Sequence, residues 1–458
     1  MAVSCTGTGT PRMKIRDFLE IDYAFFFASL VLTVFGILFI YSSGVTSSGV
    51  VVSNEYQKQI IWAVAGLLIA LIISLLNYKR IYDFSLYLYG FSVLLLIYTC
   101  TLGRRVTGDS SMVGMGRWIN IGGFGIQPSE FAKITTILFL ARYLDSTKHS
   151  RNGIIRFAFS CIIVFIPLLF IVIQPDLGTA LVFIPILLVM CFIGGITTRY
   201  ILFLGGCVTL TGLMTLLPLW QEIITKGEYP VLMILMNYRF ILTGVLMLTM
   251  IGGISYFGYR RFNKRYFYWI CYFAVMVIFS LTASFASHKV LKGYQMMRLI
   301  VFLDPNVDPR GSGWHIIQSM TAIGSGGFTG KGFLQGTQSH YRFLPTQSTD
   351  FIFSIFTEEW GFMGGLLIMA LFLLICLRLI RLIRTTSDTF GAYIAAGLAA
   401  MYSFHFIINT GMAMGIMPIT GIPLLFMSYG GSALISAMAG VGLAMSIHVR
   451  RFDSGLSL

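Results

Sequence analysis

Two Asp-Pro pairs lie four residues apart in the longest polar segment of the chain, at Asp304-Pro305 and Asp308-Pro309. Proline fixes its own φ and biases the preceding residue toward an extended conformation, so each carboxylate is predicted to lie on stiff, non-helical backbone. A carboxylate held in this way could act as a general base. The alternative is a plain turn, because aspartate and proline are both common turn residues. For one pair taken alone, the turn is the more frequent outcome.

A second candidate pair, Glu130 and Lys133, lies in the sequence QPSEFAK. Their i, i+3 spacing places both side chains on one face of a helix. Charged groups inside membrane spans are costly and usually face a cavity or a partner, which predicts a functional pair. A structural ion pair near the membrane surface fits these residues equally well. Asp176 is interpreted as a loop acid at the membrane interface, and Glu358 and Glu359 as capping or pairing groups.

The sequence lacks the motifs of several common chemistries. No HxH or HExxH spacing accompanies the histidines, so a dedicated histidine metal site is not expected. There is neither a GxSxG elbow nor a GxxxxGK[ST] phosphate loop, which argues against serine hydrolases and P-loop nucleotide binding. The 7 cysteines form no CxxC pair. Most of them lie in apolar runs, which argues against a disulfide framework and a zinc site.

The elements that position these groups are predicted to be membrane helices. Hydrophobic residues make up 56% and charged residues 11% of the 458 residues, a composition that excludes an ordinary soluble enzyme. The predicted fold is an all-α polytopic membrane protein, with about twelve apolar segments long enough to cross a bilayer. They lie near 22–44, 58–76, 84–102, 127–144, 155–173, 178–196, 200–219, 240–258, 267–286, 355–377, 392–412 and 431–448.

The formal net charge of +14 is explained by membrane orientation. Basic residues collect on the cytoplasmic side of membrane proteins. When the N-terminus is placed inside, the short basic loops, including Arg260, Arg261, Lys264 and Arg265, fall on the same side. Both termini are therefore predicted to be cytoplasmic. Since the excess charge is an orientation signal, no nucleic-acid partner is expected.

Two loops on the predicted outer side are long, at 103–126 and 287–354. The second is rich in Gly, Ser, Thr and Gln, yet it also contains Phe, Tyr, Trp and Leu. A disordered linker would lack those aromatic residues. Loops of this length are usually functional or disordered, so 287–354 is predicted to be a folded, functional loop.

The motifs resemble those of the SEDS family, the shape, elongation, division and sporulation proteins that polymerise peptidoglycan. The similarity extends in order along nearly the whole chain, and it is closer to the rod-shape elongation type than to the division type. The motifs are GRWINIGGFGIQPSEFAK (116–133), QPDLGTA (174–180), FLDPNVDPRGSGWHIIQS (302–319), AIGSGG (322–327), TDFIFS (349–354) and GIPLLFMSYGGSAL (421–434).

The resemblance implies a peptidoglycan glycosyltransferase that uses lipid II, a disaccharide-peptide carried on undecaprenyl pyrophosphate. It implies that Asp308 is the essential residue of the long loop, and that Glu130 and Lys133 line a membrane cavity. Family members usually have about ten spans, so the excess is interpreted as a helix pair inserted at 221–286. The implied organisation is a cytoplasmic segment at 1–21 and a single membrane domain at 22–458, with the catalytic loop at 287–354.

The chemistry of such a reaction needs one base and several cations. Pyrophosphate is a good leaving group, so a single carboxylate could take the proton from the acceptor 4-hydroxyl while attack at the donor C1 inverts the linkage. The pyrophosphate charge requires basic side chains or a divalent cation such as Mg²⁺ or Mn²⁺. The candidate cations are Lys133, Arg117, Arg298 and Lys331, and Asp304 is a possible metal ligand. No tightly bound cofactor is expected.

Two departures from the family pattern bear on cation placement. Met320 and Thr346 stand where family members commonly have Lys and Glu. The resemblance also implies a class B penicillin-binding protein, a transpeptidase, as partner, with other elongation-complex proteins, in the bacterial cytoplasmic (inner) membrane with an extracytoplasmic catalytic face. A lipid II flippase and a non-enzymatic cell-wall scaffold are the alternative functions.

Overall fold

The computed structural model describes residues 22–101, 115–121, 124–150, 152–223, 237–290, 293–344 and 346–452. The predicted segment 1–21 lies outside these residues. A helix forms at each predicted span. The helices are α2 Tyr23–Ser43, α3 Glu55–Leu75, α4 Tyr78–Thr101, α6 Pro128–Ser146, α7 Gly153–Ile173, α8 Leu177–Ile193, α9 Thr198–Ile223, α11 Tyr238–Phe262, α12 Arg265–Val290, α16 Ile352–Thr385, α17 Thr389–Ala413 and α18 Gly431–Val449.

Ten of the described helices are long and apolar enough to cross a membrane. The other two have identifiable reasons for falling short. Helix α8 is apolar but has only 17 residues, and α6 contains Glu130, Lys133, Arg142 and Asp145 within its 19 residues. The observed fold is thus a polytopic helical bundle.

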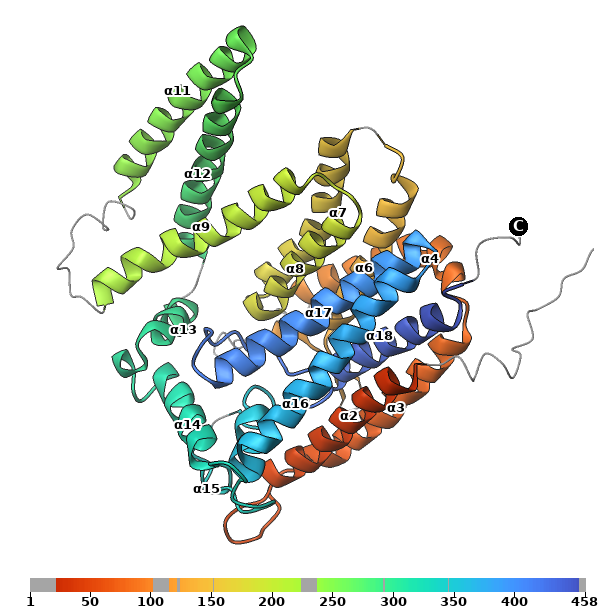
Figure 1. Ribbon diagram of the computed structural model, residues 1–458. Helices are drawn as coiled ribbons and strands as arrows, with labels where there is room; N and C mark the ends of the chain where they lie inside the picture. The colour runs from red at the N-terminus through yellow and green to blue at the C-terminus, as the bar shows by residue number, and fades with distance from the viewer. Residues whose placement is uncertain are drawn as a thin grey trace, which may run out of the picture.

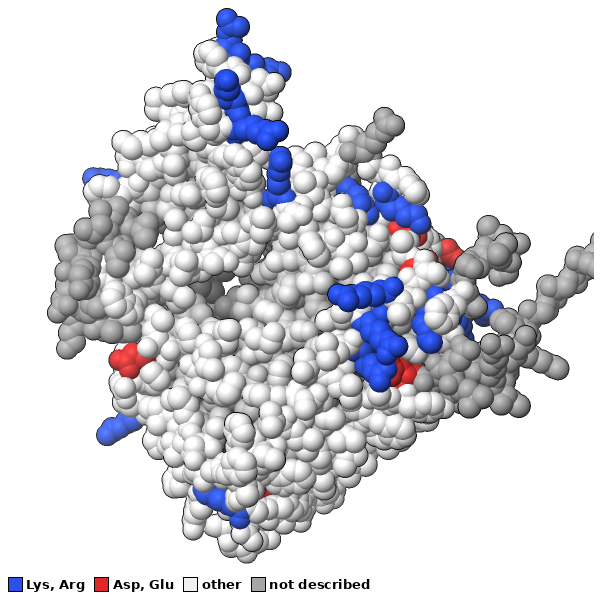
Figure 2. Space-filling model, in the orientation of Figure 1, with Lys and Arg blue, Asp and Glu red and all other residues white. Residues whose placement is uncertain are grey.

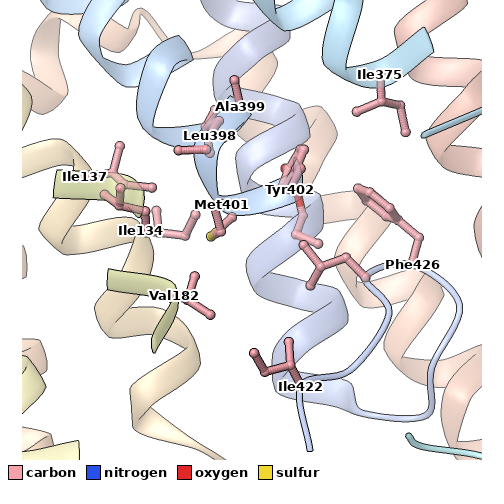
Figure 3. Packing of buried hydrophobic residues seen from close by; sticks show 14 of the residues in the cluster. Ile134, Ile137, Val182, Ile375, Leu398, Ala399, Met401, Tyr402, Ile422 and Phe426 are labelled. Carbon is pink, nitrogen blue, oxygen red and sulfur yellow. Dashed lines mark hydrogen bonds between the residues drawn. The ribbon is translucent and has the colours of Figure 1, made fainter. Parts of the chain in front are cut away.

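The core of the bundle lies between α6, α8, α16, α17 and α18 (Figure 1). Figure 3 shows apolar side chains from these helices meeting, among them Ile137 of α6, Val182 of α8 and Tyr402 of α17. The segment 414–430, which precedes α18, contributes Ile422 and Phe426 to the same cluster. Burial of this apolar surface fixes the central helices, and their ends carry the candidate site.

A short hairpin departs from the predicted all-α fold. Strands β1 Ile119–Ile121 and β2 Phe124–Ile126 pair antiparallel within the predicted loop 103–126. The sequence between them is Gly-Gly, and apolar residues alternate with a polar or small residue on either side, as Ile-Asn-Ile and Phe-Gly-Ile. A two-residue glycine connection between alternating runs favours a hairpin. The all-α prediction missed this hairpin because it rested on the lengths of the apolar segments, which give no indication of such short strands.

The segment 287–354 is built from short helices: α13 Gly293–Leu303, the 3₁₀ helix η3 Pro305–Val307, α14 Ser312–Ser325 and α15 Thr337–His340. It packs against α16 where that helix is kinked at Gly361, whose φ is +64°. A Cβ on Gly361 would lie 2.3 Å from the nitrogen of Gly330. The contact between the segment and α16 therefore requires glycine at position 361.

The helix pair α11 and α12 extends away from the central bundle (Figure 1). Helix α12 packs on α11 and on α9, whereas α11 packs mainly on α12. Only 6% of the most apolar 18-residue window of α11 is buried within the chain. Figure 2 shows Lys and Arg gathered at the tip of this pair and at the end of the bundle where the C-terminus lies, with fewer near α15.

Candidate active site

Glu130 and Lys133 form a buried ion pair in the first turns of α6. The Lys133 Nζ lies 2.8 Å from the Glu130 Oε2, and it also lies 3.0 Å from the Nε2 of His405 on α17. The exposed fractions of Glu130 and Lys133 are 2% and 0%. Glu130 lines a cavity and Lys133 does not. The lysine therefore contacts the cavity-lining carboxylate from behind and positions it.

The cavity beside Glu130, called here the Glu130 cavity, has a volume of about 550 Å³. Its walls come from the N-terminal ends of α3, α6, α8 and α18, from the hairpin and from residues 346–350. Lys58, Trp62 and Trp118 add a cation and two indole rings. A cavity of this size with a few converging polar groups is typical of a binding site for a small molecule or headgroup.

A second cavity, called here the Arg298 cavity, has a volume of about 430 Å³ and includes Gln295 and Arg298 of α13. Arg117 and Asp176 line both cavities and so form a shared wall. The Arg117 Nε donates to the carbonyl of Gln174 at 2.9 Å, and its Nη1 lies 3.8 Å from the Asp176 Oδ1. Arg117 and Asp176 therefore lie between the cavity that contains Glu130 and the one that contains Arg298.

Asp176 has a more central place than the sequence indicated. It caps α8 by accepting from the Thr179 backbone nitrogen at 3.3 Å, and it accepts from the Gln127 Nε2 at 2.9 Å. Gly178 allows this end of α8 to approach segment 414–430, since a Cβ there would lie 2.4 Å from the carbonyl oxygen of Thr420. The QPDLG motif thus fixes one wall of both cavities.

Asp350 lines a cavity but was not predicted from the sequence as a site residue. It lines the Glu130 cavity beside Thr346 and Thr349. Burial raises the pKa of its carboxyl, while the charge of Arg298 lowers it. A Cβ on Gly421 would lie 3.7 Å from the Asp350 Oδ2 and 3.9 Å from the Arg298 Nη1, so these two groups flank one glycine. Asp350 immediately precedes an apolar helix, as Asp176 does, and this position in the sequence could have marked it as a site residue.

Asp308 lies in the turn between η3 and α14, outside the residues that line the two cavities. Its Oδ1 accepts from the Gly311 backbone nitrogen at 3.0 Å, and its carbonyl accepts from the nitrogen of Gly313, also at 3.0 Å. A Cβ on Gly311 would lie 2.2 Å from the Asp308 Oδ2. The carboxylate is therefore held on a tight, glycine-dependent turn, partly exposed.

Asp304 caps η3, with its Oδ1 accepting from the backbone and side-chain nitrogens of Asn306 at 2.9 and 3.1 Å. Asp304 thus forms a plain turn, which was the alternative prediction for an Asp-Pro pair. Among the described residues, no group of three or more His, Cys, Asp or Glu side chains could hold a metal ion. The residues present thus do not form a protein-only site for Mg²⁺ or Mn²⁺ at Asp304.

Lys331 is engaged away from the cavities. Its Nζ contacts the Glu358 Oε1 at 2.8 Å and the hydroxyls of Ser325 and Thr337 at 2.7 Å. Glu358 is fully buried at the start of α16 and also accepts from the backbone nitrogen of Gln338 at 2.9 Å. Of the predicted site residues, Glu130, Arg117 and Arg298 line the cavities, Lys133 supports Glu130, and Asp308 and Lys331 lie elsewhere.

Comparison with known proteins agrees with this arrangement of motifs. The family model described as a cell cycle protein, of the FtsW, RodA and SpoVE type, matches residues 23–229 and 229–452. The chain belongs to this family. Within the SEDS family, it is 49% identical to the peptidoglycan glycosyltransferase RodA of Treponema pallidum, over 96% of this chain and 100% of that protein. It is 31% identical to the peptidoglycan glycosyltransferase MrdB of Escherichia coli, over 97% and 98% of the two chains.

Solved structures share the SEDS fold. One structure, titled as the structural coordination of polymerization and crosslinking by a peptidoglycan synthase complex, matches with a TM-score of 0.64 and 25% identity, over 95% of this chain and 99% of the other. The rod shape-determining protein RodA of Thermus thermophilus matches with a TM-score of 0.58 and 22% identity, over the same shares. The second likeness concerns the fold alone.

Proposed function

We propose that this chain is a peptidoglycan glycosyltransferase that polymerises lipid II into glycan strands during cell elongation and rod-shape maintenance. The observation that carries the proposal is the 49% identity to the Treponema pallidum RodA, which extends over 96% of this chain and 100% of that protein. The Escherichia coli relative, which is 31% identical, is also a peptidoglycan glycosyltransferase. The match extends over the full length of the first relative, which supports the same overall activity for this chain.

The two adjoining cavities provide the proposed place for the donor headgroup. Its pyrophosphate would lie between Arg117 and Arg298, whose guanidinium groups suit phosphate oxygens in a fork geometry. Glu130 and Asp176 would accept hydrogen bonds from sugar hydroxyls or peptide amides. Lys133 keeps the Glu130 carboxylate in place at 2.8 Å. Lys331 was predicted to join these cations, but its contacts with Glu358 make it the weakest of them.

Asp308 is the proposed general base. It takes the proton from the acceptor 4-hydroxyl as that oxygen bonds to the donor C1, the bond from C1 to the pyrophosphate oxygen breaks, and undecaprenyl pyrophosphate leaves with the electron pair. One displacement converts the α linkage into a β linkage. Helix α13 leads from Arg298 directly into the turn that holds Asp308, so a pyrophosphate at Arg298 would place the donor sugar toward that carboxylate.

Any divalent cation is proposed to arrive with the substrate. Mg²⁺ is commonly held by one or two carboxylates together with substrate phosphates. This mode fits a chain in which the described residues offer no cluster of three or more metal-ligating side chains. No step of the proposed mechanism requires the ion.

The membrane arrangement follows from the same proposal. The chain is proposed to span the bacterial inner membrane about twelve times, with both termini cytoplasmic and residues 287–354 outside. The basic residues at the end of the bundle where the C-terminus lies, and at the α11–α12 tip, support this orientation (Figure 2). A class B penicillin-binding protein is the proposed partner, with other elongation-complex proteins. It would cross-link the strands that this chain produces.

The decisive experiment gives labelled lipid II in detergent to the purified chain together with its transpeptidase and resolves the products on a gel. Native protein is expected to form polymer, and Asp308→Asn is expected to form none. Asp304→Asn is the matched control, because asparagine can still cap η3. It is expected to retain activity.

The alternatives give different results in the same experiment. Unchanged polymerisation by Asp308→Asn would remove Asp308 from the role of base. Absence of polymer from native protein, combined with movement of lipid II across vesicle membranes, would assign a flippase. Absence of both activities would favour a scaffold.

A further inference from the structure

The turn between α11 and α12 gathers four cations, Arg260, Arg261, Lys264 and Arg265, all of them exposed. Asn263 closes the turn in the left-handed conformation, with φ +49°, so the two helices meet without a longer loop. This set of residues is called here the basic hinge. Because the turn is short, the four side chains project from one tip (Figure 2).

Arg199, at the start of α9, adds a fifth cation. Its guanidinium carbon lies 5.6 Å from the ring centre of Tyr268 and 5.9 Å from that of Trp269. The hydroxyl of Tyr272 donates to the Arg199 carbonyl at 2.9 Å. Helices far apart in the sequence thus bring positive charge to the same end of α12.

Within the part of the chain that the structure describes, no carboxylate pairs with these cations. The ranges 177–221 and 229–303 contain no Asp or Glu. At the end of the bundle where the C-terminus lies, by contrast, cations have acidic partners. Lys148 pairs with Asp145 at 3.4 Å, and Arg378 pairs with Asp22 at 3.6 Å. Among the described residues, no ion pair reaches the five cations at the hinge and at Arg199. The hinge is therefore suited to an anion from outside the chain.

An apolar groove of about 540 Å³ starts at the basic hinge and follows α12. Its floor on α12 is a single helical stripe from Tyr266 through Trp269 and Phe273 to Val277, and Leu248 and Ile251 of α11 form the other wall. Eleven residues of helix rise correspond to about 16 Å, close to half of the ~30 Å hydrocarbon core of a bilayer. The groove is thus one leaflet deep, with cations at its mouth.

We propose that the groove and the basic hinge together bind one anionic phospholipid. An acyl chain lies along the α12 stripe, and the phosphate lies among the hinge cations and Arg199. Orientation of the chain in the membrane accounts for basic residues at the hinge, but it requires neither a groove that begins there nor an arginine of α9 over the ring of Trp269, which lines the groove. The groove extends through about one leaflet, which matches the length of one acyl chain.

The experiment uses the purified full chain in detergent and phospholipids with brominated acyl chains, which quench tryptophan fluorescence on contact. The quenching that native protein shows and Trp269→Phe lacks reports the groove. Phosphatidylglycerol is expected to quench Trp269 at about tenfold or more lower mole fraction than phosphatidylcholine, since each nearby cation contributes a severalfold preference for anionic lipid.

Two double variants of equal charge separate a site from a general surface field. Arg260→Gln/Arg261→Gln is expected to abolish most of the preference, whereas Arg381→Gln/Arg384→Gln, at exposed positions on α16, is expected to keep it. Equal quenching by the two lipids, or an equal loss in both variants, would overturn the proposal. So would full displacement of phosphatidylglycerol by millimolar inorganic phosphate, because the acyl chain would then contribute nothing. Protection of Trp269 from both lipids in a dimeric chain would assign the groove to a second copy.

Discussion

The carboxylate of Asp308 depends on the absence of a side chain three residues away. A Cβ on Gly311 would lie 2.2 Å from the Asp308 Oδ2, so Gly311→Ala must move the carboxylate. We expect polymerase activity to fall by about a hundredfold, because a displacement near 1 Å can cost that much. Gly324→Ala in α14 is the control, since nothing lies within 4 Å of its Cβ. Equal activity in the two variants would contradict the role of this turn.

Lys331 is expected to matter for stability more than for substrate binding. Its removal leaves the buried Glu358 without its cation, and breaking such a pair costs about 3 kcal/mol or more. Lys331→Met should therefore lower the thermal unfolding midpoint in detergent. Lys148→Met removes a lysine that is 42% exposed from its ion pair and should change the midpoint little. A normal midpoint in Lys331→Met with a raised KM for lipid II would instead make it a substrate ligand.

His340 gives the loop a dependence on pH. Its Nε2 lies 3.6 Å from the Glu359 Oε1, and its Nδ1 lies 2.7 Å from the Val45 carbonyl. The nearby Glu359 carboxylate raises the pKa of His340, burial opposes this, and the Val45 carbonyl raises it further. Because the folded pKa is raised, the stabilisation is complete below the unfolded value of about 6.5 and is lost as pH rises through the folded pKa.

The measurement compares native protein with His340→Gln. The difference between their unfolding midpoints should be larger at pH 6 than at pH 9. A difference that is constant across this range would show that His340 acts by packing alone.

At the scale of elements, the close approach of α8 to segment 414–430 determines the shape of both cavities. Gly178→Ala would place a Cβ 2.4 Å from the Thr420 carbonyl oxygen and displace the α8 end that carries Asp176. We expect a loss of lipid II binding of at least about tenfold, with the bundle still folded, because only a helix end has to move. Gly212→Ala, in α9 with nothing within 4 Å of its Cβ, should bind normally. Normal binding in both would separate this approach from the site.

The helices could be predicted because long apolar runs have few alternatives in a membrane. Their ends and mutual contacts were less accessible. The residue pattern placed Glu130 and Lys133 on one helix face, and the structure has them as an ion pair. The shared wall of Arg117 and Asp176 joins segments 59 residues apart, and no local spacing indicates such a contact. The contact between Lys331 and the buried Glu358 was not predicted, because the glycine-rich sequence around the lysine gives no sign of it.

At the scale of the whole molecule, the proposed topology predicts which faces are accessible from outside the cell. In a cysteine-free background, Tyr341→Cys, at a position 59% exposed in the loop, should react with a membrane-impermeant maleimide in intact cells. Lys264→Cys, at the basic hinge, should react only after permeabilisation. Labelling of Lys264→Cys in intact cells would reverse the proposed orientation of the α11–α12 pair.

Helix α12 lies at the side of the bundle, and we expect its orientation to depend on the thickness of the bilayer. With 26 residues, α12 is about 39 Å long, which exceeds a hydrocarbon core of ~30 Å, and we expect the helix to tilt in response to this mismatch. A thinner bilayer increases that tilt and a thicker one reduces it. Because α12 is followed by α13, which carries Arg298, a change in tilt displaces a wall of the Arg298 cavity. We therefore expect lipid acyl-chain length to influence the same cation that the donor pyrophosphate is proposed to contact.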